Sequence, residues 1–396
     1  NEFLFKICFG GGKKSEPISK PGLAILGADV LDSSGLGNLD IDQLETLLAG
    51  NKISIRFEIN DNYFAFSGSG DPKEAELIFQ LIYHYLNDPG YRIEAMALTK
   101  KRYKQRYDSL TRTPEGIMLT KGNLFLAGND PRFGLPHPDT MNAYTLTDIK
   151  KWLSPHFQNS PVEVSIIGDF DEENMIGLAS KYMGALRKRK NFPNKFRPME
   201  KIIFPKGKQL ELKLETKINS GVVRVVFLTD DFWDISQTRQ LSVLSRVFSE
   251  RLRLSIREDL GASYSSYAYN NPSRIFENYG VLHVVANVKP GKHRFIYNKI
   301  KDIVDSILMD GITKKETNLV LKPFLNHLKV IRKTNGYWLN SVMANASTYP
   351  EKFDWANTII QDYHAITQTD LILLARKYLN MGDSALIVVK PRDRAE

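Results

Sequence analysis

The chain has a single cysteine, Cys8, among 396 residues. An intramolecular disulfide and a cysteine-based metal site are therefore both excluded. The sequence also lacks any apolar run of about 18 residues, so no membrane-spanning helix is expected. No signal peptide is recognisable. The chain starts at Asn1 rather than Met and enters a strand-like stretch at once, which favours an excised piece of a longer protein.

Paired histidines are also missing. No two of the seven histidines are three or four residues apart, so no helix face carries a histidine pair that could hold a metal; they are His84, His137, His156, His283, His293, His327 and His364. The net charge is +9, but the basic runs at 100–102 and 187–190 are not interleaved with aromatic residues. This pattern does not favour nucleic-acid binding.

The chain instead contains an internal repeat with an offset of about 220 residues. In each half, two strands lead through a proline into a long helix. The strands are predicted at 52–58 and 62–68 in the first half and at 264–270 and 279–287 in the second. Each half closes with a capped helix, with Thr147 and Thr369 predicted as N-caps, followed by an apolar strand.

This repeat predicts an α+β fold made of two homologous units, each a mostly antiparallel sheet with packed helices. The predicted first unit covers residues 1–190 and the second covers residues 209–396. The Pro- and Lys-rich residues 191–208 are predicted to link them. Each unit then has the size of an ordinary domain.

The most informative stretch changes from helix to strand. Its helical part has apolar residues at steps of three and four, namely Leu241, Leu244, Val247 and Phe248. Gly261 stands where a helix would end, and residues 264–269 read as extended chain. Arg257 and Tyr264 could therefore direct donors at one carbonyl oxygen. Taken alone, the residues favour the simpler interpretation, in which Arg257 forms a surface ion pair and Tyr264 packs on the core.

The pattern Arg-Glu-Asp-Leu-Gly-x-x-Tyr, from Arg257 to Tyr264, resembles a segment of the pitrilysin/insulinase family of zinc metallopeptidases. The resemblance implies that these two residues belong to the half that does not hold the zinc. There they would reach across a chamber and bind the peptide substrate. It also implies the same repeated α+β architecture, with this chain supplying two of four such units.

The same resemblance places a metal-site helix at residues 21–31, where the family carries His-x-x-Glu-His. Ile25 falls on the first histidine, Ala28 on the glutamate and Asp29 on the second histidine. None of the three matches the motif. We therefore expect no metal or other cofactor on this chain, with zinc on a partner half.

Four tyrosines of the second half allow two interpretations. They could line a peptide chamber, or they could be ordinary β-sheet packing, because tyrosine is favoured in strands. These residues are Tyr264, Tyr267, Tyr269 and Tyr279.

The Arg/Tyr segment together with the mismatched metal-site helix predicts a substrate-binding, zinc-free half of a bacterial zinc metallo-endopeptidase. This half is expected to be inactive by itself. Its expected partners are an N-terminal catalytic half, fused or separate, and peptide substrates. The alternative is a non-enzymatic scaffold or peptide-holding homologue. The resemblance to exported bacterial members favours the periplasm, with the cytoplasm as the other possibility.

Overall fold

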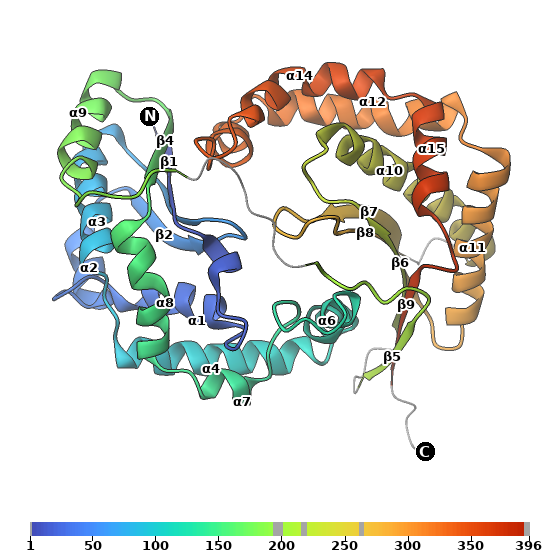
Figure 1. The fold of residues 1–396 in the computed structure, drawn as a ribbon, viewed down its shortest axis with the longest axis horizontal. Helices are drawn as coiled ribbons and strands as arrows, with labels where there is room; N and C mark the ends of the chain where they lie inside the picture. Colours follow the sequence, from blue (N-terminus) through green and yellow to red (C-terminus); the bar gives the residue numbers. More distant parts are fainter. Residues whose placement is uncertain (1, 193–200, 215–219, 261–264, 392–396) are drawn as a thin grey trace. The chain divides into compact units, whose positions relative to one another are not determined.

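The computed structural model describes residues 2–192, 201–214, 220–260 and 265–391, with only the backbone described at 258–260. These residues form two β-sheets, each covered by helices (Figure 1). The predicted α+β class is confirmed. No helix among the described residues is long and apolar enough to cross a membrane.

The chain forms two compact units, and each includes one segment from the opposite half of the sequence. Unit 1 consists of residues 1–105, 136–197 and 330–357, and unit 2 consists of residues 106–135, 198–329 and 358–396. The predicted contiguous boundaries differ from these units at the two exchanged segments. Residues 193–200 of the predicted linker lie outside the described residues.

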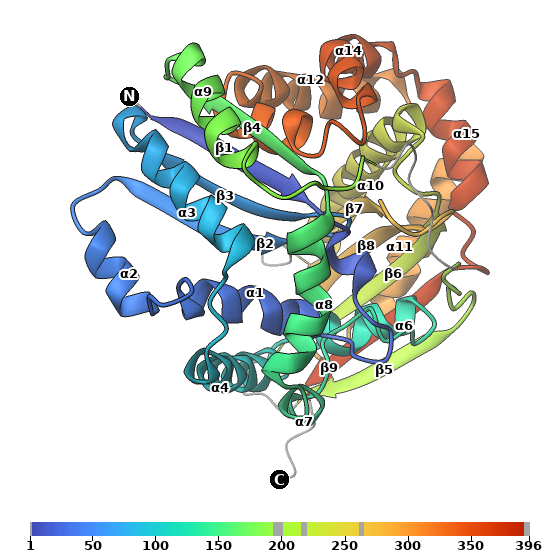
Figure 2. The same ribbon diagram turned by 60° about the vertical axis from the view of Figure 1, so that its left-hand side comes forward.

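Unit 1 is built on a four-stranded antiparallel sheet in the order β2-β3-β1-β4. Helices α1, α3 and α8 lie beside this sheet (Figure 2). The elements of the unit's own half are β1 (Phe3–Phe9), α1 (Leu23–Ser34), α2 (Ile41–Leu48), β2 (Ile53–Ile59), β3 (Phe64–Gly70), α3 (Ala75–Asn87), α4 (Ile93–Leu110), α7 (Pro138–Asn142), α8 (Leu146–Asn159), β4 (Val162–Gly168) and α9 (Glu172–Met183).

One face of this sheet is an aromatic core. Side chains alternate between the two faces of a strand, so Phe9, Phe57 and Phe66 share the face that Phe157 of α8 covers. The ring centroid of Phe157 lies 5.1 Å from that of Phe9 and 5.5 Å from that of Phe57. The opposite face carries polar residues, including Lys6.

The exchanged segment of unit 1 contains α13 (Asn335–Tyr337), the π-helix η4 (Trp338–Met343) and the start of α14 (Glu351–Ala365). It is held by Glu163 of β4, whose carboxylate is buried. The amides of Ala346 and Ser347 donate to this carboxylate at 3.2 and 2.5 Å. Satisfying these buried backbone donors attaches the segment to the sheet.

Unit 2 contains a five-stranded sheet in the order β5-β9-β6-β8-β7. Only the β5–β9 pair is parallel. The elements of the unit's own half are β5 (Gln209–Leu214), β6 (Gly221–Thr229), α10 (Ile235–Leu260), β7 (Ser266–Pro272), β8 (Gly280–Val288), α11 (His293–Asp310), α12 (Lys314–Ile331), α15 (Gln368–Tyr378) and β9 (Ala385–Pro391).

Helix α10 packs on one face of this second sheet. Its predicted apolar residues Leu241, Leu244, Val247 and Phe248 are all buried. The hydroxyl of Ser249 accepts from the Ala268 amide at 2.6 Å and donates to the Ala268 carbonyl at 3.0 Å. These bonds join α10 to the open edge of β7. Along β7, Ala268 is buried whereas Tyr267 and Tyr269 are exposed, so their side chains lie on opposite faces of the sheet.

The exchanged segment of unit 2 contains α5 (Pro114–Ile117), the π-helix η3 (Met118–Gly122) and α6 (Asn123–Leu126). Tyr279 donates to the Leu126 carbonyl at 3.4 Å. The ring of Phe133 packs against Phe276 and Tyr279, with centroids 5.1 and 5.7 Å apart.

The structure reproduces the predicted repeat but moves the N-caps. Thr145 and Thr367, not Thr147 and Thr369, cap α8 and α15. Each forms a capping box with an aspartate at the third helical position: the amides of Thr145 and Thr367 donate to Asp148 and Asp370 at 2.8 Å. This reciprocal pairing, available only to the earlier threonine, decides where each helix begins.

Candidate substrate-binding site

The helix that resembles a metal-site helix is present as α1. Ile25 and Ala28 are half-buried on it and Asp29 is exposed. Isoleucine and alanine offer no ligand atom, so the residues at these positions do not fit a zinc ion. Elsewhere in the described part of the chain, no group of three histidine, cysteine or acidic residues could hold a metal.

The Arg/Tyr segment is described only in part. Arg257 is exposed in the last turn of α10, where a cation is favourable beside the helix C-terminus. Its charge contributes to the lowered pKa of Glu250, although hydrogen bonds from Arg253 are the main cause. Tyr264 and Gly261 lie outside the described residues, so the structure places neither beside Arg257.

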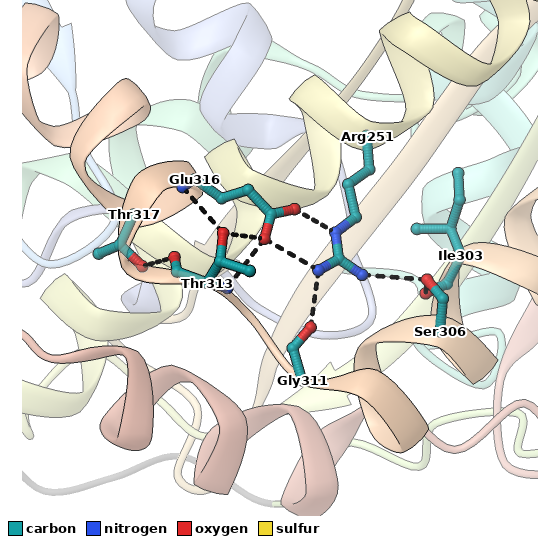
Figure 3. A network of polar contacts seen from close by, with 7 residues as sticks. All are labelled: Arg251, Ile303, Ser306, Gly311, Thr313, Glu316 and Thr317. Atoms are coloured by element: carbon teal, nitrogen blue, oxygen red, sulfur yellow. Dashed lines mark hydrogen bonds and ion pairs between the residues drawn. The ribbon is translucent and has the colours of Figure 1, made fainter.

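The helix that carries Arg257 is anchored by Arg251 (Figure 3). The Arg251 guanidinium donates to both carboxylate oxygens of Glu316 at 2.7 and 3.2 Å. It also donates to the hydroxyl of Ser306 at 3.0 Å and to the carbonyl of Gly311 at 2.7 Å. One side chain thus connects α10 to the end of α11 and to the start of α12.

Glu316 is ionised within this network. Burial opposes its ionisation, but the hydrogen bonds from Arg251 and Thr313 outweigh burial and lower its pKa to about 2. The amide and the hydroxyl of Thr313 donate to Glu316 at 2.8 and 2.7 Å. The carboxylate therefore completes the N-terminal cap of α12 while it neutralises Arg251.

The face of the second sheet opposite α10 carries aromatic and basic residues. Tyr267 and Tyr269 are exposed on β7, and their ring centroids are 6.0 Å apart. Tyr269 stacks on His283 of β8 at 4.6 Å. Tyr279, by contrast, is buried in the core. The packing interpretation therefore holds for Tyr279. For Tyr267 and Tyr269 the chamber-lining interpretation stays a prediction, and Tyr264 lies outside the described residues.

Two basic residues of this face were not identified from the sequence. Arg224 of β6 and His283 of β8 are buried, with 9% and 3% of their surface exposed. Burial, together with the charge of Arg224, lowers the pKa of His283 to about 3. A charged residue in the middle of the apolar run 222–228 was the available signal, because charges are rarely buried without a partner.

Comparison with known proteins supplies the family. Residues 143–323 match the family described as "Peptidase M16 inactive domain". These residues make up a little under half of the chain, so the match shows a resemblance to an M16 peptidase inactive domain. This confirms the family that the Arg/Tyr segment and the empty metal-site helix predict.

The relatives of this M16 domain are longer zinc proteases and processing peptidases. The chloroplastic stromal processing peptidase of Pisum sativum is 22% identical over 97% of this chain and 34% of its own length. The chain thus spans about a third of the length of this relative. A probable zinc protease of Haemophilus influenzae, PqqL, is 22% identical over 67% of the chain.

Solved structures show the same fold. The periplasmic protease PqqL from Escherichia coli superposes with a TM-score of 0.80 at 17% identity, over 99% of this chain and 43% of that one. A peptidase M16 inactive domain from Pseudomonas fluorescens gives a TM-score of 0.81 at 16% identity, over 98% and 93%. Each likeness covers nearly all of this chain, including both sheets.

Proposed function

We propose that this chain is the substrate-binding, zinc-free half of a zinc metallo-endopeptidase. It would complete a closed peptide chamber whose metal is held by a catalytic half, fused or separate. The observation that carries the proposal is the match to an M16 inactive domain together with a helix, α1, whose residues do not form the His-x-x-Glu-His motif, because Ile25 and Ala28 offer no ligand atom or base. A half without the metal-binding motif would contribute to catalysis by binding the peptide substrate.

Two residues would perform this role. Arg257 would bind carbonyl groups of the peptide, since its guanidinium is exposed and free of a carboxylate partner among the described residues. Tyr264 would donate its hydroxyl to the scissile carbonyl as negative charge develops there. The anchoring of α10 by Arg251 supports this assignment, because a substrate-binding side chain needs a rigid support.

The test is the conservative substitution Tyr264→Phe in the enzyme reconstituted with its catalytic half. Loss of one such donor typically lowers turnover about 100- to 1000-fold. We expect that loss in kcat, with the circular dichroism spectrum and unfolding midpoint unchanged. Tyr297→Phe, on the half-buried α11 position, is the matched control and should keep full activity. Unchanged turnover in Tyr264→Phe would refute the role of Tyr264.

The second candidate is a scaffold or peptide-holding protein with no hydrolysis in its assembly. It is favoured by the same mismatches to His-x-x-Glu-His at Ile25, Ala28 and Asp29. A His-x-x-Glu-His motif in the preceding sequence or in a neighbouring reading frame would support the enzyme. Absence of such a motif would support the scaffold.

We place the protein in the bacterial periplasm. The support is the similarity to PqqL of Escherichia coli, which is described as a periplasmic protease. Fractionation of cells that express the full-length protein, with antibody detection, tests this compartment. Recovery in the cytoplasmic fraction would contradict it.

A further inference from the structure

Arg224 in the second sheet is a buried cation without a counter-charge. Only 9% of its surface is exposed, and its Nε–H has no hydrogen-bond partner. No acidic side chain in the described part of the chain forms an ion pair with it. A buried guanidinium without a carboxylate partner destabilises the fold, because its lost hydration is not compensated by an opposite charge.

The neighbours of Arg224 do not supply the missing charge. His283 is 3% exposed and its Nδ1 also lacks a partner. With a pKa of about 3, its imidazole is neutral at neutral pH. Tyr269, which stacks on His283, is a neutral phenol whose pKa is raised by burial. The cluster is therefore a cation surrounded by neutral polar rings.

The corresponding position of unit 1 also carries a buried cation, but there an acidic side chain neutralises it. Lys6 of β1 corresponds to Arg224 of β6, and it is also buried. Its ammonium forms an ion pair with Glu58 of β2, two strands away, at 3.1 Å. In unit 1 the buried cation thus has an internal carboxylate.

The register of the two sheets identifies the residue that replaces this carboxylate in unit 2. Glu58 is paired with Ala65, and Ala65 with Cys8, two residues after Lys6. In unit 2 the corresponding pairs across the strands are Tyr269 with His283 and His283 with Val226. Val226 comes two residues after Arg224, as Cys8 comes two residues after Lys6. Tyr269 therefore stands where unit 1 has Glu58.

We propose that Arg224 is a subsite for a carboxylate of a bound peptide, with His283 and Tyr269 lining it. The ligand's carboxylate would take the place that Glu58 occupies beside Lys6. Its source is either an acidic side chain or the C-terminal carboxylate of the peptide. The inference rests on the proposed peptide-binding function and adds a preference for acidic residues to it.

The surroundings of the subsite fit a peptide. Tyr267 and Tyr269 are 42% and 37% exposed on β7, the edge strand of the sheet. Stacked aromatic rings beside a charged group provide apolar contact for a peptide while the guanidinium selects a carboxylate. The two rings are exposed while Ala268 between them is buried, so α10, which bonds to Ala268, does not cover them.

The test compares peptides that differ by one group, with the complete 396-residue chain. A short unstructured peptide with blocked ends carries either one Glu or one Gln, and fluorescence anisotropy measures the two Kd values. A charge-assisted hydrogen bond predicts that the Glu peptide binds about 10- to 100-fold more tightly. A third peptide, with Gln and a free C-terminus, distinguishes a terminal carboxylate from a side chain.

Two variants test whether Arg224 causes the difference in Kd between the Glu and Gln peptides. Arg224→Met should bind the Glu and Gln peptides equally, at the affinity of the wild type for Gln. Tyr269→Glu should also bind the two peptides equally. Its new carboxylate would pair with Arg224, as Glu58 pairs with Lys6 in unit 1, and so would occupy the place of the ligand. Arg56→Met removes an exposed arginine of β2 and should keep the wild-type preference.

Thermal unfolding gives a second readout. Both variants should raise the unfolding midpoint: Arg224→Met removes the uncompensated buried charge, and Tyr269→Glu supplies a carboxylate that pairs with it. A lower midpoint for Arg224→Met would show that Arg224 supports the fold and would overturn the proposal.

The binding outcomes separate this inference from the proposed function. Equal binding of the two peptides by the wild type, or a preference for Glu that survives in Arg224→Met, would overturn the inference alone. Binding of no peptide at all would overturn both the subsite and the peptide-gripping role of the chain.

Discussion

At the scale of single residues, three cations show three ways of treating charge inside this chain. Lys6 has an internal carboxylate, Glu58, on the same sheet. Arg251 has a carboxylate and two further oxygen acceptors from neighbouring elements. Arg224 has no carboxylate partner among the described residues, and its Nε–H has no hydrogen-bond acceptor. The first two arrangements stabilise the fold, and the third leaves free energy to be gained from a ligand.

The Arg251 network makes a prediction about stability. Arg251→Met should lower the free energy of unfolding by about 2–3 kcal/mol, because Glu316 would keep its charge without its cation. Arg253→Met is the matched control two residues away. Arg253 is 42% exposed and pairs with Glu250 within one helix turn, so its loss should cost about 0.5 kcal/mol or less. Denaturant unfolding of the three proteins measures the difference.

This prediction has a pH dependence of known sign. The pKa of Glu316 in the folded chain is about 2, below its ordinary value of 4.5. The stabilisation is therefore complete above pH 4.5 and is lost as the pH falls towards 2. The difference in the free energy of unfolding between the wild type and Arg251→Met should decrease as the pH falls from 4.5 towards 2. A gap that stays constant would show that Arg251 stabilises the fold by packing alone.

At the scale of elements, the two exchanged segments repeat each other. Each begins at a threonine N-cap, Thr113 or Thr334, which follows a long helix. Each then forms a short α-helix and continues as a π-helix, η3 or η4. The same local construction appears twice, so the exchange is a property of the repeated unit.

A substitution of Glu163 tests whether its carboxylate holds residues 330–357 on the sheet of unit 1. Glu163→Ala would leave the buried amides of Ala346 and Ser347 without acceptors, at a cost of about 2–4 kcal/mol for two donors. Hydrogen exchange should increase selectively within residues 330–357. Glu45→Ala, exposed on α2 of the same unit, should leave both quantities unchanged. Faster exchange spread evenly over unit 1 would contradict a local anchoring role.

At the scale of the whole molecule, the two units share a strand arrangement but differ in the charged residues that they carry. The order β2-β3-β1-β4 of the first sheet corresponds to β7-β8-β6-β9 of the second, and β5 is an additional edge strand. The first unit has the helix α1, which lacks the His-x-x-Glu-His motif, and a buried Lys6 that is paired with Glu58. The second unit carries Arg257 and the unpaired Arg224. We infer that substrate contacts are concentrated in unit 2.

A whole-molecule prediction follows from this division. The isolated chain should bind no stoichiometric zinc and should cleave no peptide, and addition of the zinc-bearing half should produce hydrolysis. Elemental analysis of the purified chain and a quenched fluorescent peptide measure these outcomes. The zinc-bearing half alone is the control. Stoichiometric zinc in the isolated chain, or hydrolysis by it, would refute the proposed division.

The sequence by itself determined the elements and the family. The spacing of Leu241, Leu244 and Val247 predicts the buried face of α10, because helix periodicity is a local property. The repeat predicts two antiparallel sheets, and the mismatches at Ile25, Ala28 and Asp29 predict a half without zinc ligands. The role of Tyr264 stays a prediction, since it lies outside the described residues.

Only the tertiary structure decided which distant residues meet. The exchange of residues 106–135 and 330–357 depends on long-range contacts such as those of Glu163, which no local pattern encodes. The missing counter-charge of Arg224 likewise emerges only from the strand register, which aligns Tyr269 with the position of Glu58. Register and burial are set by the packing of the whole sheet, and the cost of a buried charge depends on both.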